Sequence, residues 1–168
     1  MTHFFDTFST PLGLFSAAVN EAGAVTATAF GNEAALVSRL KEKPSLIRVP
    51  SAAATVRAQL LAYFAGELRD FTLDVAPAGT AFQQQVWAAL RKIPSGSVQT
   101  YGQIAAQIGQ TGAARAVGRA NATNPICVLI PCHRVIGANG SLTGFAFGEA
   151  CKRRLLAIEG ARLPPGAR

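Results

Sequence analysis

A cluster of structure-breaking residues divides this chain of 168 residues, and it constrains the possible folds more than any other feature. The cluster is Ala76-Pro77-Ala78-Gly79, and proline and glycine at this density end regular structure. Before it, short apolar stretches are bounded by turn residues, which is typical of strands. After it, apolar residues recur every three or four positions, as in amphipathic helices. We therefore predict two domains, residues 1–78 and 79–162, and a loose tail over residues 163–168.

The residues before the break predict a small sheet with helices. Residues 12–19 and 24–30 are apolar and flank Glu21-Ala22-Gly23, which indicates a hairpin. Residues 32–43 begin with an asparagine cap, and residues 51–65 have apolar side chains at helical spacing before Gly66, so both ranges predict helices. Residues 71–75 alternate between apolar and polar side chains and predict a half-buried strand.

The residues after the break predict a mainly helical domain. Two capping boxes, Thr80 with Gln83 and Thr100 with Gln103, each begin a helix. A further helix over residues 113–121 follows a tight turn, which gives the helix-turn-helix pattern, although such pairs also occur in proteins that bind no DNA. Residues 126–130 are continuously apolar and predict a buried strand, and residues 148–159 predict a last amphipathic helix.

Basic residues are concentrated after the break. Through residue 80 the chain has six Lys or Arg against seven Asp or Glu, and beyond it ten against two. The second half therefore holds all of the excess behind the net charge of +7. A basic surface attracts nucleic acid, but a solvated basic face gives the same count, so charge alone leaves both interpretations open.

Composition indicates a compact globule, because 49% of the residues are hydrophobic and 15% are charged. No stretch reaches the ~18 uncharged apolar residues that a membrane-spanning helix needs. The first residues lack the basic segment of a signal peptide and include Asp6, so we expect a cytoplasmic protein with no membrane partner. The three cysteines form no Cys-x-x-Cys pair and only His3 and His133 could join them, so we predict no metal site.

Cys132 has the setting of a reactive thiol. An apolar strand ending in Pro131 would present the next side chain at the strand edge, where it is both rigid and accessible. His133 and Arg134 follow, and they supply a base and a positive charge, both of which favour the thiolate. A Cys-His pair is weak evidence alone, because most such thiols are small core residues. We interpret the other two cysteines, Cys127 and Cys151, as core or surface filler.

Residues 80–160 carry a series of motifs in a fixed order. They are Phe82-Gln83-x-x-Val86-Trp87, Ile93-Pro94-x-Gly96, Tyr101-Gly102-Gln103-Ile104-Ala105, Arg115-Ala116-Val117-Gly118, Asn124-Pro125, Ile130-Pro131-Cys132-His133-Arg134-Val135, Lys152 and Glu159. In this series the chain resembles the 6-O-alkylguanine-DNA alkyltransferases, also called methylated-DNA–protein-cysteine methyltransferases. The resemblance implies an α+β fold with an N-terminal ribonuclease-H-like sheet domain and a C-terminal, mainly helical, winged helix-turn-helix domain. It also implies DNA repair by one irreversible transfer of an alkyl group, from oxygen 6 of guanine or oxygen 4 of thymine, to the protein.

The resemblance implies a role for each matching residue of the site. Cys132 would accept the alkyl group, and His133 would remove its proton through a bridging water. Glu159 would orient and charge-stabilise His133, by the logic of a hydrolase triad. Asn124 would brace the turn that holds the thiol, and Tyr101 would donate a proton to the departing guanine.

The resemblance implies double-stranded DNA as the partner, bound in the minor groove with the damaged base flipped out of the stack. Arg115 resembles the finger that fills the gap left by the flipped nucleotide, and Arg119 is a further candidate contact. Small residues in the same helix, including Ala114 and Gly118, would let the backbone approach a groove, although ordinary helix packing predicts the same composition. No cofactor is required, because the damaged DNA is itself the alkyl donor. We expect a monomer.

The loop expected over the base departs from the pattern. Related chains commonly have Gly-Tyr-x-Gly-Gly or Gly-Tyr-x-Trp-Gly, whereas this chain has Gly144-Phe145-Ala146-Phe147-Gly148. The hydroxyl missing at Phe145 would slow transfer by the ~1 kcal/mol of one hydrogen bond. We hypothesise that Phe147 narrows the base pocket, which Val135 also lines, and so favours methyl over benzyl adducts.

Three other functions compete with this interpretation. A protein that flips alkylated bases without transfer would lack the reactive cysteine, which this chain retains. A helix-turn-helix regulator would leave Cys132, His133 and Glu159 unexplained. A cysteine hydrolase would need an oxyanion or substrate motif, and we find none in the sequence.

Overall fold

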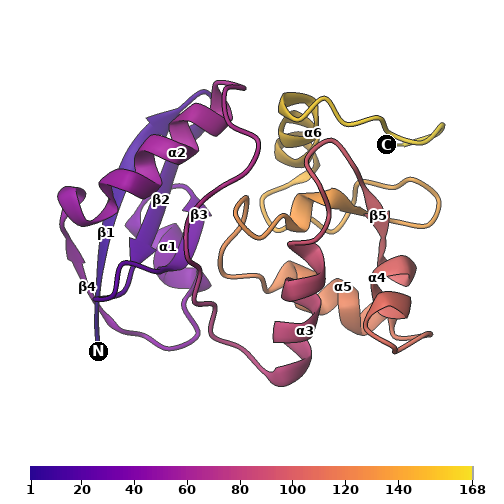
Figure 1. Cartoon of the computed structure of the whole chain (residues 1–168), viewed down its shortest axis with the longest axis horizontal. Coiled ribbons are helices and arrows are strands. Elements are labelled where there is room, and N and C mark those ends of the chain that lie inside the picture. The colour runs from indigo at the N-terminus through magenta and orange to yellow at the C-terminus, as the bar shows by residue number, and fades with distance from the viewer. Residues whose placement is uncertain (168) are drawn as a thin grey trace. The chain divides into compact units, whose positions relative to one another are not determined.

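The computed structural model describes residues 1–167, and the chain forms two compact units (Figure 1). Unit 1 contains Met1–Gly79 together with Pro125–Leu129. Unit 2 contains Thr80–Asn124 and the chain from Ile130 onward. The five residues 125–129 thus belong to unit 1, although the residues on both sides of them belong to unit 2.

Unit 1 is built on a mixed four-stranded sheet with the order β3-β2-β1-β4. The strands β1, β2 and β3 pair antiparallel, and β4 pairs parallel to β1. The predicted hairpin of β2 and β3 is confirmed, whereas no local pattern in the sequence predicted β1 and β4. The bounds are β1 Thr2–Thr10, β2 Gly13–Val19, β3 Val25–Phe30 and β4 Ser45–Arg48.

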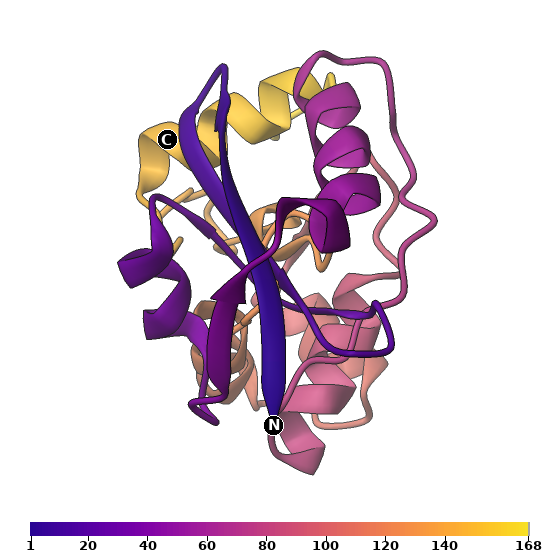
Figure 2. The same ribbon diagram turned by 90° about the vertical axis from the view of Figure 1, so that its left-hand side faces the viewer.

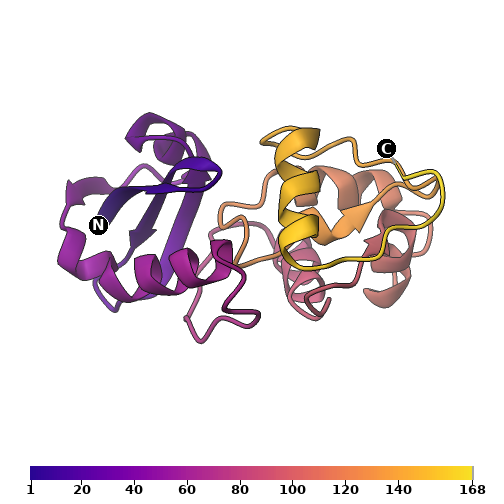
Figure 3. The same ribbon diagram turned by 90° about the horizontal axis from the view of Figure 1, so that it is seen from above.

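Two helices, α1 (Glu33–Arg39) and α2 (Ala54–Phe64), lie on opposite faces of this sheet (Figures 2 and 3). Both helices were predicted, but α1 is shorter than expected, because the backbone becomes extended at Leu40. A 3-10 turn, η1 (Pro50–Ala53), leads into α2. With both faces covered, every residue from Phe15 to Ala29 within β2 and β3 is buried, as two-sided packing requires.

Two predicted strands are absent, and both segments instead cover the edge of β3. Residues 71–75 are irregular except for an isolated bridge between Val75 and Val25. Residues 126–130 likewise make only bridge-type pairing, including that of Ile126 with Thr28, before a turn in which Val128 has φ 74°. The apolar run is buried because it packs along this edge, and its backbone could not continue a ladder through such a turn.

Unit 2 is mainly helical, as predicted. Both capping boxes are formed, at Thr80 and at Thr100. The indole of Trp87 donates a hydrogen bond to the Ala120 carbonyl (2.8 Å), which ties α3 to α5. The elements are α3 Ala81–Leu90, β5 Gln99–Thr100, α4 Tyr101–Gln107, α5 Ala114–Ala122, the 3-10 turn η2 Cys132–Arg134, β6 Val135–Ile136 and α6 Glu149–Ile158, with β5 parallel to β6.

Residues 159–167, which follow α6, are irregular, but the first part of this segment is packed. Leu163 lies against a small apolar cluster formed by Ile136, Leu142 and Leu156. Arg168, the end of the predicted loose tail, lies outside the described residues. Among residues 1–167, none of the helices is both long enough and apolar enough to cross a membrane.

Candidate active site

Cys132 is the first residue of η2 and is 4% exposed. Its backbone N–H donates to the Ile130 carbonyl (2.7 Å), which makes a tight turn around Pro131. The side-chain amide of Asn124 donates to the same Ile130 carbonyl (2.8 Å), and that of Asn121 donates to the Cys132 carbonyl (3.2 Å). Two buried asparagines therefore hold the backbone that carries the thiol, one of which, Asn121, the sequence did not reveal.

A buried ionic network follows directly from η2. The Nε2 atom of His133 lies 2.7 Å from Glu159 Oε2, at the C-terminal end of α6. The guanidinium of Arg134 donates to both oxygens of the same carboxylate, at 2.8 and 3.0 Å, and to the Ile93 carbonyl at 2.7 Å. Glu159 therefore receives three hydrogen bonds from two neighbouring residues, which fixes the imidazole against it.

This network determines the charges of its members. Burial acts to raise the pKa of Glu159, but hydrogen bonds from His133 and Arg134 and their positive charge outweigh it, so the pKa lies well below its usual value. Burial lowers the pKa of His133, and although Glu159 acts the other way, the charges of Arg134 and Lys152 also lower it. The site thus pairs a carboxylate with a neutral imidazole at neutral pH. The Nδ1 atom of that imidazole is buried and makes no hydrogen bond within residues 1–167.

Lys152 is a fully buried cation in α6, and its ammonium donates to the Val135 carbonyl. Burial lowers its pKa to about 8, whereas the charges of Cys132 and Glu149 act to raise it. Val135 itself is buried in β6, directly after η2. The lysine therefore contacts the backbone three residues after Cys132 and interacts electrostatically with the thiol itself.

Tyr101 is the first residue of α4 and is partly buried near the thiol. Burial raises the pKa of its phenol and the charge of Cys132 raises it further, while a hydrogen bond to Asn121 acts to lower it. Its ring lies beside Gly118 of α5, and a methyl group at Gly144 would come within 3.2 Å of its hydroxyl. Because Gly144 also has φ +90°, that position requires glycine, and the loop passes close to the phenol.

The pair α4 and α5 forms the predicted helix-turn-helix, with α4 packed against α5. Arg115 and Arg119 are exposed one turn apart on α5, whereas Ala114 and Gly118 are half-buried. The side chains that α5 buries are Val117, Ala120 and Asn121. The small residues thus serve helix packing in part, and the two arginines are left facing solvent.

The loop before α6 contains the two phenylalanines that depart from the expected pattern. Phe145 is 8% exposed, and Phe147 is half-buried. Their rings meet edge to face with centroids 5.8 Å apart, a favourable aromatic arrangement. Phe145 thus packs against Phe147 in the loop whose Gly144 lies close to the Tyr101 hydroxyl.

Comparison with known proteins assigns the fold and the family. Residues 81–161 match the family model described as 6-O-methylguanine DNA methyltransferase, DNA binding domain. A crystal structure of Mycobacterium tuberculosis OGT in complex with DNA is 40% identical, has a TM-score of 0.83, and covers 99% of this chain and 97% of that chain. The chain belongs to the 6-O-methylguanine DNA methyltransferase family.

Curated members of this family match over a shorter range. A methylated-DNA–protein-cysteine methyltransferase of Methanosarcina acetivorans is 58% identical over 103 residues, which are 61% of this chain and 66% of that protein. One of Mycobacterium bovis is 58% identical over 106 residues, which are 63% of this chain and 64% of that protein. The chain therefore spans just under two thirds of the length of these curated relatives.

In this family member, the sequence missed the burial of Arg134 and Lys152. Both are charged residues, which are ordinarily exposed, and both are instead buried with protein partners. A signal was present for the lysine, because Lys152, Leu155, Leu156 and Glu159 follow helical spacing and all four are buried. A charged residue on an apolar helix stripe indicates a buried polar contact.

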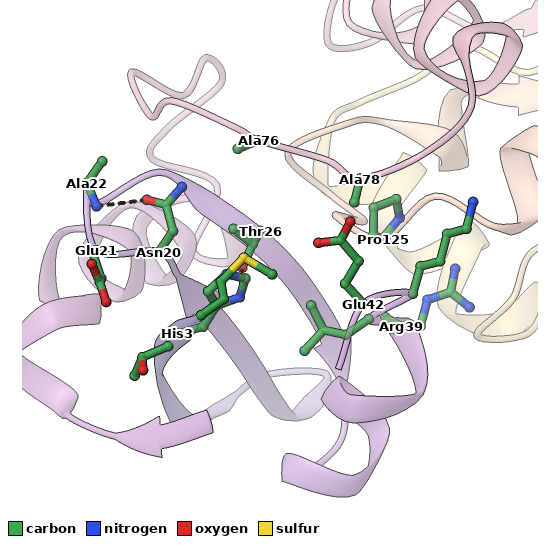
Figure 4. A pocket seen from close by; sticks show the side chains of 14 residues that line it. His3, Asn20, Glu21, Ala22, Thr26, Arg39, Glu42, Ala76, Ala78 and Pro125 are labelled. Carbon is green, nitrogen blue, oxygen red and sulfur yellow. Dashed lines mark hydrogen bonds between the residues drawn. The ribbon is translucent and has the colours of Figure 1, made fainter. Parts of the chain in front are cut away.

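Unit 1 of this methyltransferase family member contains a cavity of about 400 Å³ (Figure 4). His3 and Thr26 are hydrogen-bonded within it (3.1 Å), and Arg39, Glu42 and Pro125 lie around it. Its lining mixes both signs of charge and contains no cysteine. Within residues 1–167, no group of three or more His, Cys, Asp or Glu side chains could hold a metal ion.

Proposed function

We propose that this protein repairs alkylated DNA by transferring a methyl or other alkyl group from oxygen 6 of guanine, and from oxygen 4 of thymine, to the sulfur of Cys132. The observation that carries the proposal is the buried constellation around this thiol. Cys132 precedes His133, whose Nε2 is held by Glu159 at 2.7 Å while its Nδ1 is buried without a protein partner. Family membership supports the same reaction.

His133 acts as the base that generates the thiolate. Because burial lowers its pKa, the imidazole is neutral at physiological pH and can accept a proton. The carboxylate of Glu159 accepts the hydrogen bond from Nε2–H, which leaves Nδ1 with a lone pair. A buried nitrogen of this kind needs a polar partner, and a water between Nδ1 and Sγ would carry the proton from Cys132.

Tyr101 acts as the acid for the leaving group. The thiolate of Cys132 attacks the alkyl carbon, a C–S bond forms, and the bond from that carbon to oxygen 6 of guanine breaks. The guanine leaves neutral if it gains a proton, and the raised pKa of Tyr101 keeps its phenol protonated for donation. The product is a thioether with no reverse route, so each molecule acts once and needs no cofactor.

The helix-turn-helix of unit 2 supplies the DNA contacts. Arg115, exposed in the first turn of α5, enters the base stack and fills the space left by the flipped nucleotide. Arg119 contacts the backbone, and Ala114 and Gly118 allow close approach in the minor groove. Val135, Phe145 and Phe147 line the pocket for the flipped base, and Asn124 braces the turn beneath the thiol. The M. tuberculosis relative was crystallised in complex with DNA, which supports duplex DNA as the partner.

A direct test is stoichiometric label transfer. The whole chain is incubated with duplex DNA that carries a radiolabelled methyl group on oxygen 6 of one guanine, and protein-bound label is counted. We expect up to one methyl per molecule, none in Cys132→Ala, and full transfer in the control Cys151→Ala. A base-binding protein or a regulator would bind the DNA and take no label. Label retained in Cys132→Ala would refute the acceptor, and turnover beyond one methyl per molecule would refute the single-use mechanism.

We also propose that the protein acts in the cytoplasm as a monomer. The three cysteines are all thiols, which suits a reducing compartment. Sedimentation of the protein without DNA should give a mass near 17.5 kDa.

A further inference from the structure

Lys152 is a buried cation that has no role in the proposed proton transfers and alkyl transfer. Its side chain has 0% exposure, yet in the part of the chain that the structure describes it forms no ion pair and one hydrogen bond, to the Val135 carbonyl. An ammonium has three N–H donors, so this bond satisfies one of them. Burying a charge is costly unless it is compensated, and an apolar side chain would suit the stripe it shares with Leu155 and Leu156.

The charged and titratable groups that interact with Lys152 indicate what compensates it. They come from two elements, Cys132 and His133 of η2 and Glu149 of α6. The negative charge of the Cys132 thiolate acts to raise the pKa of Lys152, so thiolate and ammonium stabilise each other. Glu149 is exposed at the first turn of α6, where water screens its charge.

We propose that Lys152 is a positioning residue for alkyl transfer, whose buried ammonium stabilises the Cys132 thiolate and holds the Val135 carbonyl at the base pocket. The inference rests on the proposed role of Cys132 as acceptor. The same positive charge opposes protonation of His133. Lys152 therefore keeps the imidazole neutral before it accepts the proton of Cys132, and it stabilises the thiolate that remains after that transfer.

The test measures the thiol without DNA. The rate at which iodoacetamide alkylates Cys132, identified by mass spectrometry, is followed from pH 5.5 to 9.5 in the whole chain, and its midpoint reports thiolate formation. Lys152→Met removes both the charge and the donor, whereas Lys152→Gln removes the charge and keeps a donor for Val135. Arg153→Met, at the exposed neighbouring position, is the control.

We expect both Lys152→Met and Lys152→Gln to move the midpoint up by about one pH unit or more, so alkylation at pH 7 slows about tenfold and recovers at high pH. The control should match the natural protein. Lys152→Arg keeps the charge and should keep a low midpoint. Melting curves identify variants that fold. Unchanged midpoints in folded Lys152→Gln, or a rise in Lys152→Arg equal to that in Lys152→Gln, would overturn the proposal.

Methyl transfer from DNA is measured on the same proteins, which separates the two proposals. If the natural chain takes no methyl from DNA while the midpoint still depends on Lys152, the repair function fails and the coupling of Lys152 to Cys132 stands. If methyl transfer is normal and the midpoint does not depend on the lysine charge, the role of Lys152 fails and the repair function stands.

Discussion

Replacing Glu159 by Gln should strongly destabilise the fold. The carboxylate side chain is 1% exposed and accepts hydrogen bonds from His133 and twice from Arg134. The substitution leaves a guanidinium, itself 8% exposed, buried without its counter-charge. Breaking a buried pair from one side costs about 3–5 kcal/mol. For a chain of this size, that corresponds to a fall in melting temperature of about 10 °C.

The pH dependence of this loss follows from the lowered pKa of Glu159. The carboxylate contributes its full stabilisation above the unfolded-state pKa, near 4.5, and this contribution is lost as the pH falls through the lower folded-state pKa. The difference between the natural protein and Glu159→Gln should therefore be constant from pH 5.5 to 8 and shrink below about pH 4.5. Both proteins should also lose stability below about pH 6.5, because His133 stays neutral when folded and takes up a proton when unfolded.

Urea unfolding followed by tryptophan fluorescence provides the assay, since Trp87 is buried in α3 of the same unit. The control is Glu149→Gln, an exposed carboxylate on the same helix as the network, which should change the free energy of unfolding by about 0.5 kcal/mol or less. A loss below about 1 kcal/mol in Glu159→Gln would refute the reasoning. The reasoning would also be refuted if the difference in free energy of unfolding between the two proteins stayed the same below about pH 4.5.

Three further predictions concern other parts of the protein. Tyr101→Phe should slow methyl transfer about 100-fold in a single-turnover assay, as expected for loss of a general acid, with DNA affinity unchanged; a rate within threefold of the natural one would exclude the role. Thr28→Val should lower the free energy of unfolding by about 1–3 kcal/mol, because the buried Cys127 carbonyl loses a hydrogen bond of 2.8 Å. The exposed control Thr55→Val should change it by no more than about 0.5 kcal/mol. Phe147→Gly should raise the reaction rate with benzylated guanine relative to methylated guanine, and an unchanged ratio would show that Phe147 does not narrow the pocket.

The parts of the fold that the sequence predicted are those with local signals. The capping boxes at Thr80 and Thr100 involve residues three positions apart, so the helices they begin could be located from the chain alone. The pairing of β1 with β4 joins residues more than forty positions apart and leaves no local pattern. Residues 126–130 have the composition of a strand, but they are buried because they pack along the edge of β3. This tertiary contact cannot be recognised from the composition of the segment.

In the candidate site too, some features have local sequence signals and others depend on tertiary contacts. Cys132, His133 and Glu159 could be named from motifs and resemblance, and the structure places His133 against Glu159. The burial of Lys152 had a local signal in its helical stripe, but that of Arg134 could not be predicted from the chain, because charged residues are ordinarily exposed and only a specific partner makes burial tolerable. For Arg134 that partner is Glu159, which lies 25 positions later in the sequence.

Residues 125–129 belong to unit 1 although they lie within the sequence of unit 2, and this limits where the chain could be cut into separate fragments. The segment leaves unit 2 after Asn124 and returns at Ile130, and the hydrogen bond between these two residues closes its base. A shortened protein beginning at Thr80 would keep the thiol but expose Ile126, Val128 and Leu129, all buried in the intact chain. We therefore expect this fragment to aggregate more readily than the intact chain, even where its helices form. Cleavage between residues 79 and 80 would instead give two fragments able to reassemble, since the second carries the peptide that completes the edge of the first.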